Sequence, residues 1–172
     1  LDLWKNEVKW TITIIDKNLR DLDILLWISE ENKALNDSYE IYLWAKNSQT
    51  KNKAVILMAV GFTYRSGSEE EFRKYLIEQN YVEAIIQLPP NLHSATSIET
   101  TFFVINKNKT DDKVHFINLK DESFIKRDGR QLVFKSLDYI VDIYENKKEI
   151  EKISCLISND EIVQNNYSFA ID

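Results

Sequence analysis

Apolar and polar residues follow patterns that predict strands in several parts of the chain. Residues 10–16 (WTITIID) alternate large and polar side chains and are rich in β-branched types, which predicts a strand with one covered face. Residues 53–60 (KAVILMAV) are apolar throughout and end at Gly61, as is typical of a central strand buried on both faces. The short apolar run at residues 23–28 is compatible with either a strand or a helix. Further strands are predicted at residues 82–88, 100–106, 114–119 and 131–134.

Helical periodicity separates these strands. Residues 37–48 form an amphipathic pattern, and polar residues at its start can cap the helix. After the central strand, Ser68 and Glu71 have the spacing of a capping box, and acidic residues fill the first turn. The apolar face of this second helix consists of Phe72, Tyr75, Leu76 and Ile77.

The C-terminal third of the chain predicts two more helices, preceded by a small basic loop. Residues 136–150 have helical periodicity, and Ser158 with Glu161 has capping-box spacing for a short final helix. The inward face of the longer helix is predicted to hold Leu137, Ile140, Val141 and Tyr144. The basic loop, with only weak attraction for phosphate, contains Lys126, Arg127 and Arg130.

The order of strands and helices predicts an α/β fold. Strand, helix and strand in succession are typical of right-handed crossover units and of a mostly parallel sheet with helices on both faces. The connection between Pro89 and Glu99 is too short for a crossover helix. The strand at residues 100–106 is therefore expected to run antiparallel to the strand at residues 82–88, as the one antiparallel strand.

Composition restricts the function classes. The chain has 172 residues, which favours a single domain, and its 28 acidic and 22 basic residues give a formal net charge of -6. The basic residues are scattered, so tight binding of nucleic acid by this chain alone is not expected. Cys155 is the single cysteine, so no internal disulfide can form, and a reducing cytoplasm is expected. The Cys155 thiol is expected to be inert and to lie in the core, and no Cys/His spacing suggests a metal site. The longest apolar run, residues 54–60, is too short to span a membrane.

One short motif raises the question of catalysis. Enzymes that methylate amino groups of DNA bases carry an Asn-Pro-Pro-aromatic loop at the end of a strand, whose asparagine holds the target amino group. Here Asn91 follows Pro89 and Pro90 instead of preceding them, and no aromatic residue comes after the prolines. A strand terminator followed by a surface turn explains this motif better than a catalytic loop does.

A longer stretch resembles a known family. The segment EEEFRKYLIEQNYVEAIIQLPPNLHSATSIETTFFVINKNK is similar to the second half of the methylase domain in the modification subunit of type I restriction-modification systems. The match continues at VHFINL and through LDYIVDIYENKKEIEKISCLISNDEIVQNNYSF. It covers residues 37–170, a methyltransferase-like half-domain with a C-terminal helical tail, whereas residues 1–36 match poorly.

This resemblance implies a partial, doubly wound, Rossmann-like methyltransferase sheet. The family sheet runs 3-2-1-4-5-7-6, and the strands found here correspond to the contiguous half 4-5-7-6. The complete family domain binds S-adenosylmethionine and methylates N6 of adenine in DNA. This chain has only Gly61, Gly67 and Gly129, none in the context of a cofactor loop, so no cofactor is expected to bind to it. The strand resembling the one before the catalytic loop is followed by Trp27 and Ile28, so no catalytic residue is assigned and the chain alone is expected to be inactive.

The resemblance also implies candidate DNA contacts and partners. The candidate contacts are Arg65, in the loop after the central strand, and Asn91, His93 and Thr96, in the loop after the prolines. A solvated turn at Arg65 and a solvent-facing His93 are the simpler alternatives. His115 alternates with apolar neighbours and is expected to lie on the polar face of its strand. Expected partners are the remaining methylase half, the specificity subunit and, through the complex, DNA; a homodimer is an alternative, and no membrane partner is expected.

The sequence therefore predicts part of a type I DNA adenine methyltransferase subunit, or a degenerate homologue of one. The chain begins with Leu1, which fits a fragment, a truncated product or a trimmed protein. The alternative is a noncatalytic interaction module of a restriction or DNA-modification complex. The sheet edge that the missing strand would normally cover is then either paired by residues 10–16 of this chain or free to bind a partner chain. An unrelated small-molecule enzyme is disfavoured, because no nucleophile, general base or phosphate-binding loop can be named.

Overall fold

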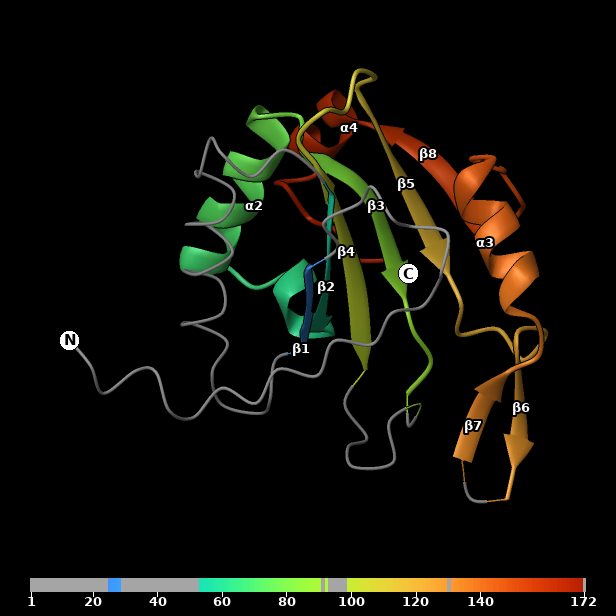
Figure 1. Ribbon diagram of the computed structural model, residues 1–172. Helices are drawn as coiled ribbons and strands as arrows, with labels where there is room; N and C mark the ends of the chain where they lie inside the picture. Colours follow the sequence, from blue (N-terminus) through green and yellow to red (C-terminus); the bar gives the residue numbers. More distant parts are fainter. Residues whose placement is uncertain (1–24, 29–52, 91, 93–98, 130, 172) are drawn as a thin grey trace.

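A six-stranded sheet organises the described part of the protein in the computed structural model, which describes residues 25–28, 53–90, 92, 99–129 and 131–171 (Figure 1). The strand order is β1-β2-β4-β3-β5-β8. The strands are β1 (Leu25–Ile28), β2 (Lys53–Ala59), β3 (Val82–Gln87), β4 (Thr100–Asn106), β5 (Lys113–Asn118) and β8 (Ser154–Ser158). The four-strand part β1-β2-β4-β3 has the order expected for the 4-5-7-6 half of a methyltransferase sheet.

The pairing directions correct one prediction. The pairs β1/β2 and β3/β5 are parallel, whereas β2/β4, β3/β4 and β5/β8 are antiparallel. A mostly parallel sheet with one antiparallel strand is therefore not confirmed, since antiparallel pairs predominate. The reason is that β4 returns between β2 and β3, and β8, which was not predicted, turns back along β5. The predicted antiparallel pairing of β4 with β3 is confirmed by the register Ile85↔Phe103.

The helices begin and end at positions that local capping explains in part. Helix α2 (Ser68–Glu78) starts after Gly67, whose φ is 82°, and no side chain caps it, so the predicted capping box at Ser68 is wrong. Helix α4 (Asn159–Gln164) does carry the predicted capping box between Ser158 and Glu161. Helix α3 (Leu137–Glu145) is capped by the Ser136 side chain, and the short 3-10 helix η1 (Val60–Thr63) follows β2.

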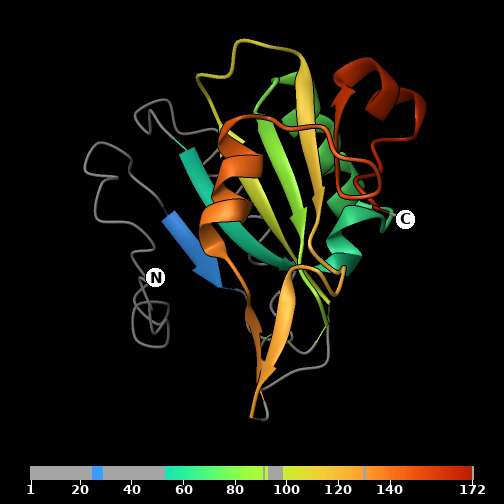
Figure 2. The ribbon, with the colours of Figure 1, turned by 90° about the vertical axis from the view of Figure 1, so that its right-hand side faces the viewer.

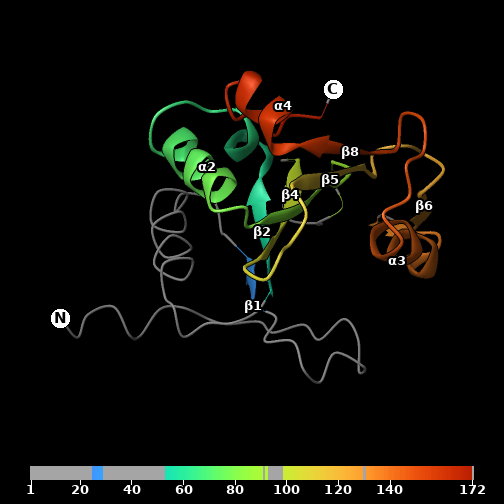
Figure 3. The same cartoon turned by 90° about the horizontal axis from the view of Figure 1, so that it is seen from above.

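Helices cover both faces of the sheet, as predicted (Figure 3). On one face, α2, α4 and the C-terminal tail (residues 165–171) pack over a core that includes Phe62, Leu76, Phe103 and Phe169. Edge-to-face contacts between aromatic rings, such as Phe62 against Phe103 with ring centres 5.0 Å apart, help to fix this packing. The central strand β2 serves both faces, because Ile56 and Met58 lie in this core and Leu57 in the other.

The opposite face is covered by α3, whose inward side differs from the predicted one. Ile143 is fully buried, and Ile140 and Tyr144 pack beside it. Leu137 and Val141, which were predicted to face inward, are 58% and 45% exposed. Because apolar residues occur almost all round this nine-residue helix, periodicity could not select the buried side.

A small hairpin forms a second sheet beside α3. Strands β6 (Ile125–Asp128) and β7 (Gln131–Phe134) pair antiparallel. The predicted strand at residues 131–134 is confirmed, but the predicted basic loop is wrong for Lys126 and Arg127, which lie within β6. The predicted strand at residues 10–16 and the predicted helix at residues 37–48 lie outside the described residues.

Candidate functional site

The carboxyl ends of four strands meet at one edge of the sheet. Strands β1, β2, β3 and β5 run in the same direction, and β4 begins where they end. We call this the carboxyl edge; it consists of residues 60–65, 87–90, 99–101 and 118–120. Open α/β sheets bind ligands outside the carboxyl ends of their strands, so this edge is the candidate functional site.

Backbone hydrogen bonds fix the segments of the carboxyl edge relative to one another. Val60 N–H donates to the Glu99 carbonyl at 2.9 Å, and Leu88 N–H donates to the Thr100 carbonyl at 2.9 Å. Leu119 N–H donates to the Gln87 carbonyl, also at 2.9 Å. These hydrogen bonds therefore fix the positions of the strand ends relative to one another, for β2, β3 and β5 and for the start of β4.

Arg65 is the predicted DNA contact that the structure describes, and it lies on this edge. Its N–H donates to the Gly61 carbonyl at 3.0 Å, and its side chain is 58% exposed. A Cβ at Gly61 would lie 2.7 Å from the Arg65 guanidinium carbon, so the glycine leaves room for the guanidinium to lie against η1. Glu69 Oε1 is 4.0 Å from Arg65 Nη1, a weak contact across the first turn of α2.

The other predicted contacts, Asn91, His93 and Thr96, lie outside the described residues. Pro90 and Glu99, which flank the segment that contains them, both belong to the carboxyl edge. The strand β3 ends at Gln87, just before the prolines, as expected of a strand terminator.

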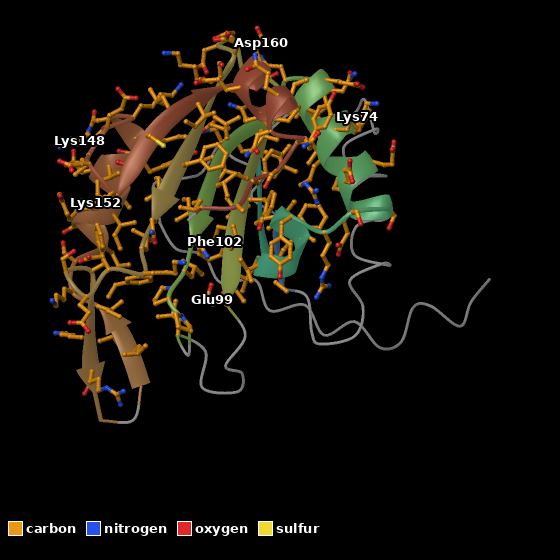
Figure 4. All side chains as sticks on the ribbon, turned by 180° about the vertical axis from the view of Figure 1, so that it is seen from behind. Lys74, Glu99, Phe102, Lys148, Lys152 and Asp160 are labelled. Atoms are coloured by element: carbon orange, nitrogen blue, oxygen red, sulfur yellow. The ribbon has the colours of Figure 1, made fainter. Side chains whose placement is uncertain are left out.

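Polar side chains continue the edge between β3 and β4. Gln87 and Thr101 are buried partners in the register of these strands. Gln87 Nε2 donates to Glu99 Oε2 at 3.1 Å, and Lys120 Nζ lies 4.0 Å from the same oxygen. Figure 4 shows Glu99 at the start of β4. Gln87 Oε1 and Thr101 Oγ1 are buried without a hydrogen-bond partner among the described residues.

A buried arginine that sequence reasoning did not single out holds the η1 end of this edge in place. Arg73 is 1% exposed; its Nε donates to the Tyr167 carbonyl and its Nη1 to the Phe62 carbonyl, both at 2.8 Å. Burial lowers the pKa of Arg73, although the charges of Glu70 and Glu69 oppose this. One signal was available in the sequence, because Arg73 falls on the apolar face of α2 next to Phe72.

A second polar cluster lies at the opposite edge of the sheet and anchors α3. Lys53 Nζ and Asn106 Nδ2 donate to the two carboxylate oxygens of Glu83, each at 2.5 Å, and the Tyr144 hydroxyl donates to the same carboxylate. Burial alone would raise the pKa of Glu83, but these hydrogen bonds and the Lys53 charge lower it overall. Burial and the Glu83 carboxylate raise the pKa of Tyr144. Every oxygen of this carboxylate is partnered within the fold, so the cluster is structural.

Two expectations for titratable residues are wrong. His115 is 1% exposed rather than on a polar face, and its Nε2 lies 3.2 Å from the Lys148 carbonyl. Burial lowers the pKa of His115, so the neutral ring is favoured. Cys155 is exposed on β8 and does not lie in the core. Its pKa is raised by partial burial and by Glu149 and Glu161, which leaves the thiol poorly activated.

The described residues contain neither a group of three or more side chains suited to a metal ion nor a helix long and apolar enough to cross a membrane. What they contain is a mixed α/β sheet with helices on both faces and an ordered carboxyl edge. This architecture places the described part of the chain in the class of α/β proteins with an open mixed sheet, in which ligands generally bind outside the carboxyl ends of the strands.

The chain belongs to the N-6 DNA Methylase family, whose pattern matches residues 6–172. It is 38% identical over 119 residues to the type I restriction enzyme MpnII methylase subunit of Mycoplasma pneumoniae, a match that covers 69% of this chain and 22% of that protein. It is 30% identical over 193 residues to the MjaVII methylase subunit of Methanocaldococcus jannaschii, covering 98% of this chain and 33% of that protein.

A solved structure agrees with these relatives. The methyltransferase subunit of a type I restriction-modification system from Streptococcus thermophilus superposes with a TM-score of 0.70 at 27% identity, over 79% of this chain and 29% of that one. The resemblance to type I modification subunits inferred from the sequence is confirmed. The chain spans about a third or less of the length of these relatives.

Proposed function

We propose that this chain supplies the far half of the methylase domain of a type I modification subunit, which methylates N6 of adenine in DNA. The observation that carries the proposal is the strand order β1-β2-β4-β3, which is contiguous in the family sheet and leaves β1 at one edge. Among the described strands, β1 pairs with β2 alone, so its other edge is where the first half of the domain would continue the sheet.

The methyl donor would be held by a segment outside this chain. A cofactor loop needs glycines that let the backbone approach the ligand closely. At Gly61 that room is taken by the Arg65 guanidinium, whereas Gly67 and Gly129 have positive φ angles of 82° and 60° and occupy turns. These residues do not fit S-adenosylmethionine, so the chain's part in the reaction is to support and bind DNA.

The carboxyl edge is the proposed DNA-facing surface. Arg65 on η1, with Asn91, His93 and Thr96 in the following loop, would contact the DNA held by the complete complex. Support comes from the exposed guanidinium of Arg65 and from the buried Arg73, which fixes η1 from beneath. Partners would be the first half of the methylase domain and the specificity subunit, in the cytoplasm; a homodimer is the alternative assembly.

A calorimetric titration separates this proposal from a self-sufficient methyltransferase. S-adenosylmethionine titrated into the 172-residue chain should produce no binding heat, and the chain alone should not methylate DNA. Mixed with the missing methylase half and the specificity subunit, the chain should co-elute and take part in a complex that transfers methyl groups to DNA adenine. A clear binding isotherm for the chain alone would contradict the assignment of the donor site to another segment.

A noncatalytic interaction module is the second candidate, favoured by the same open edge of β1 and by the poor fit for the methyl donor. In that case the chain should co-elute with a modification or specificity subunit, and the assembly should gain no methylation activity. The activity of the mixed complex therefore distinguishes the two functions.

A further inference from the structure

The β6–β7 hairpin projects beyond the sheet at the end where β3 and β5 finish (Figures 1 and 2). Its register runs from Ile125↔Phe134 at the base to Asp128↔Gln131 near the tip. Gly129 has a φ of 60° at the turn, a conformation that suits glycine and tight hairpins. The hairpin therefore extends from the same edge as the proposed DNA-facing surface.

The base of the hairpin is fixed to the protein core. Ile125 and Phe134 pack against the core under α3, and Lys135 N–H donates to the Phe124 carbonyl at 2.8 Å. The buried Phe124 ring also stacks on Tyr139 of α3, with ring centres 5.9 Å apart and planes 13° apart. A ribbon rooted in this way holds the direction of its tip with little loss of entropy on binding.

The hairpin carries a charge opposite to that of the whole chain. Residues 125–135 include the basic residues Lys126, Arg127, Arg130 and Lys135 and one acidic residue, Asp128, whereas the chain has a net charge of -6. The side chains of Lys126 and Arg127 are exposed, and neither forms an ion pair with another described residue. Neighbouring residues of a strand point to opposite faces, so the Lys126 and Arg127 side chains lie on opposite faces of the ribbon.

We propose that Lys126 and Arg127 at the hairpin contact the phosphate backbone of duplex DNA beside the segment held at the carboxyl edge. The inference rests on the proposed function, because it assumes that DNA lies along that edge. A two-stranded ribbon fits within a DNA groove, and a cation on each of its faces can then reach phosphates of either strand. Such contacts position the protein without reading the sequence. An acidic protein also needs locally concentrated cations wherever a polyanion approaches it.

Salt dependence of DNA binding tests the assignment. The complex that contains this chain would be titrated with duplex DNA between 50 and 200 mM salt, in three forms: unchanged, with Lys126→Ala and Arg127→Ala, and with Lys74→Ala and Lys113→Ala. The last pair removes the same charge away from the hairpin; Figure 4 shows Lys74 on α2, and Lys113 begins β5 at the edge opposite to the carboxyl edge.

Each phosphate contact contributes about 0.9 to the slope of log affinity against log salt. The hairpin variant should have a slope shallower by about 1 to 2, so its affinity deficit should shrink about 4- to 16-fold between the two salt concentrations. The Lys74/Lys113 variant should parallel the unchanged complex. A charge-conserving variant, Lys126→Arg with Arg127→Lys, should restore the original slope if charge is what matters.

A hairpin variant whose slope equals that of the unchanged complex would overturn the assignment. Loss of co-elution with the specificity subunit at an unchanged slope would also overturn it, since the hairpin would then be a protein contact. If the unchanged complex binds DNA and methylates it while the hairpin variant keeps the same slope, this inference fails and the proposed function stands. If the unchanged complex neither binds nor methylates DNA, the proposed function itself fails.

Discussion

Replacing Arg73 by methionine should lower the stability of the fold where η1 meets the C-terminal tail. Methionine is shorter than arginine but replaces most of its aliphatic stem, and it cannot donate to the carbonyls of Phe62 and Tyr167. Those carbonyls now accept hydrogen bonds of 2.8 Å from a guanidinium that is 1% exposed. The substitution therefore leaves two acceptors without their partner between η1 and the C-terminal tail.

The magnitude follows from the two lost bonds. A hydrogen bond to a charged group contributes about 1.5–3 kcal/mol, and an acceptor left buried and unpaired costs a comparable amount. Removing a desolvated cation returns part of this loss, since burial disfavours the charged guanidinium. We expect the free energy of unfolding to fall by about 2–4 kcal/mol. Arg73→Lys should recover only part of it, because an ammonium group lacks the fork that reaches both carbonyls.

Urea denaturation of the three proteins measures the loss, and hydrogen exchange locates it. The amide of Phe169, which donates to the Thr63 carbonyl at 2.8 Å, and that of Arg65, which donates to Gly61, should exchange faster in Arg73→Met. Amides of β3 and β5 should be affected only through global stability. The matched control is Arg127→Met on the exposed hairpin, which should change stability by less than about 0.5 kcal/mol. An Arg73→Met protein as stable as this control would refute the assigned role.

Two further predictions concern the face covered by α3. Glu83→Gln should remove the stabilisation that comes from the ionised Glu83 carboxylate. The fold lowers the pKa of Glu83, so the protein without this substitution has the full stabilisation above the ordinary pKa of 4.5. It loses that stabilisation as the pH falls through the lower pKa of the folded state. Urea midpoints compared from neutral pH to pH values below 4.5 should converge for the two proteins, and a constant gap would contradict the assignment. Ile143→Ala should lower the free energy of unfolding by about 2–5 kcal/mol, because the side chain is fully buried. Leu137→Ala, at a 58% exposed position, should lower it by less than about 0.5 kcal/mol. Equal losses of stability in urea denaturation would show that α3 buries another face.

The strands that sequence patterns identified are those with continuous apolar runs. Strands β2, β3 and β4 were predicted within one residue of their observed ends, because each buries side chains on both faces. Strand β8 was missed, since Ser154–Ser158 is short and mixes polar with apolar residues. This omission bears on Cys155, which seemed to belong to a core but lies exposed on β8. The error at His115 has another cause, because its ring contacts the Lys148 carbonyl, 33 positions along the chain.

The polar contacts that hold the site could not be predicted from local spacing. Arg73 meets the Tyr167 carbonyl 94 positions along the chain, and Glu83 meets Tyr144 at a separation of 61. Such pairs depend on which helices and strands become neighbours in the fold, and the residues near each position in the sequence do not show this. The capping box at Ser68 failed for a local reason instead, because Gly67 with its positive φ became the residue that precedes the helix.

The Arg73 and Glu83 clusters attach the helices to the sheet at positions away from β1. Arg73 fixes η1 and the tail on one face at the carboxyl edge, whereas Glu83 fixes α3 on the other face at the opposite edge. Among the described residues, these attachments reach η1, the C-terminal tail, β2, β3 and β4, and none of them uses the outer edge of β1. Because these attachments avoid that edge, the proposed first half of the domain would be able to add to β1 without displacing the carboxyl edge or the hairpin. Substitutions in the hairpin should accordingly alter DNA binding while leaving both cores, and the joining of the two halves, unchanged.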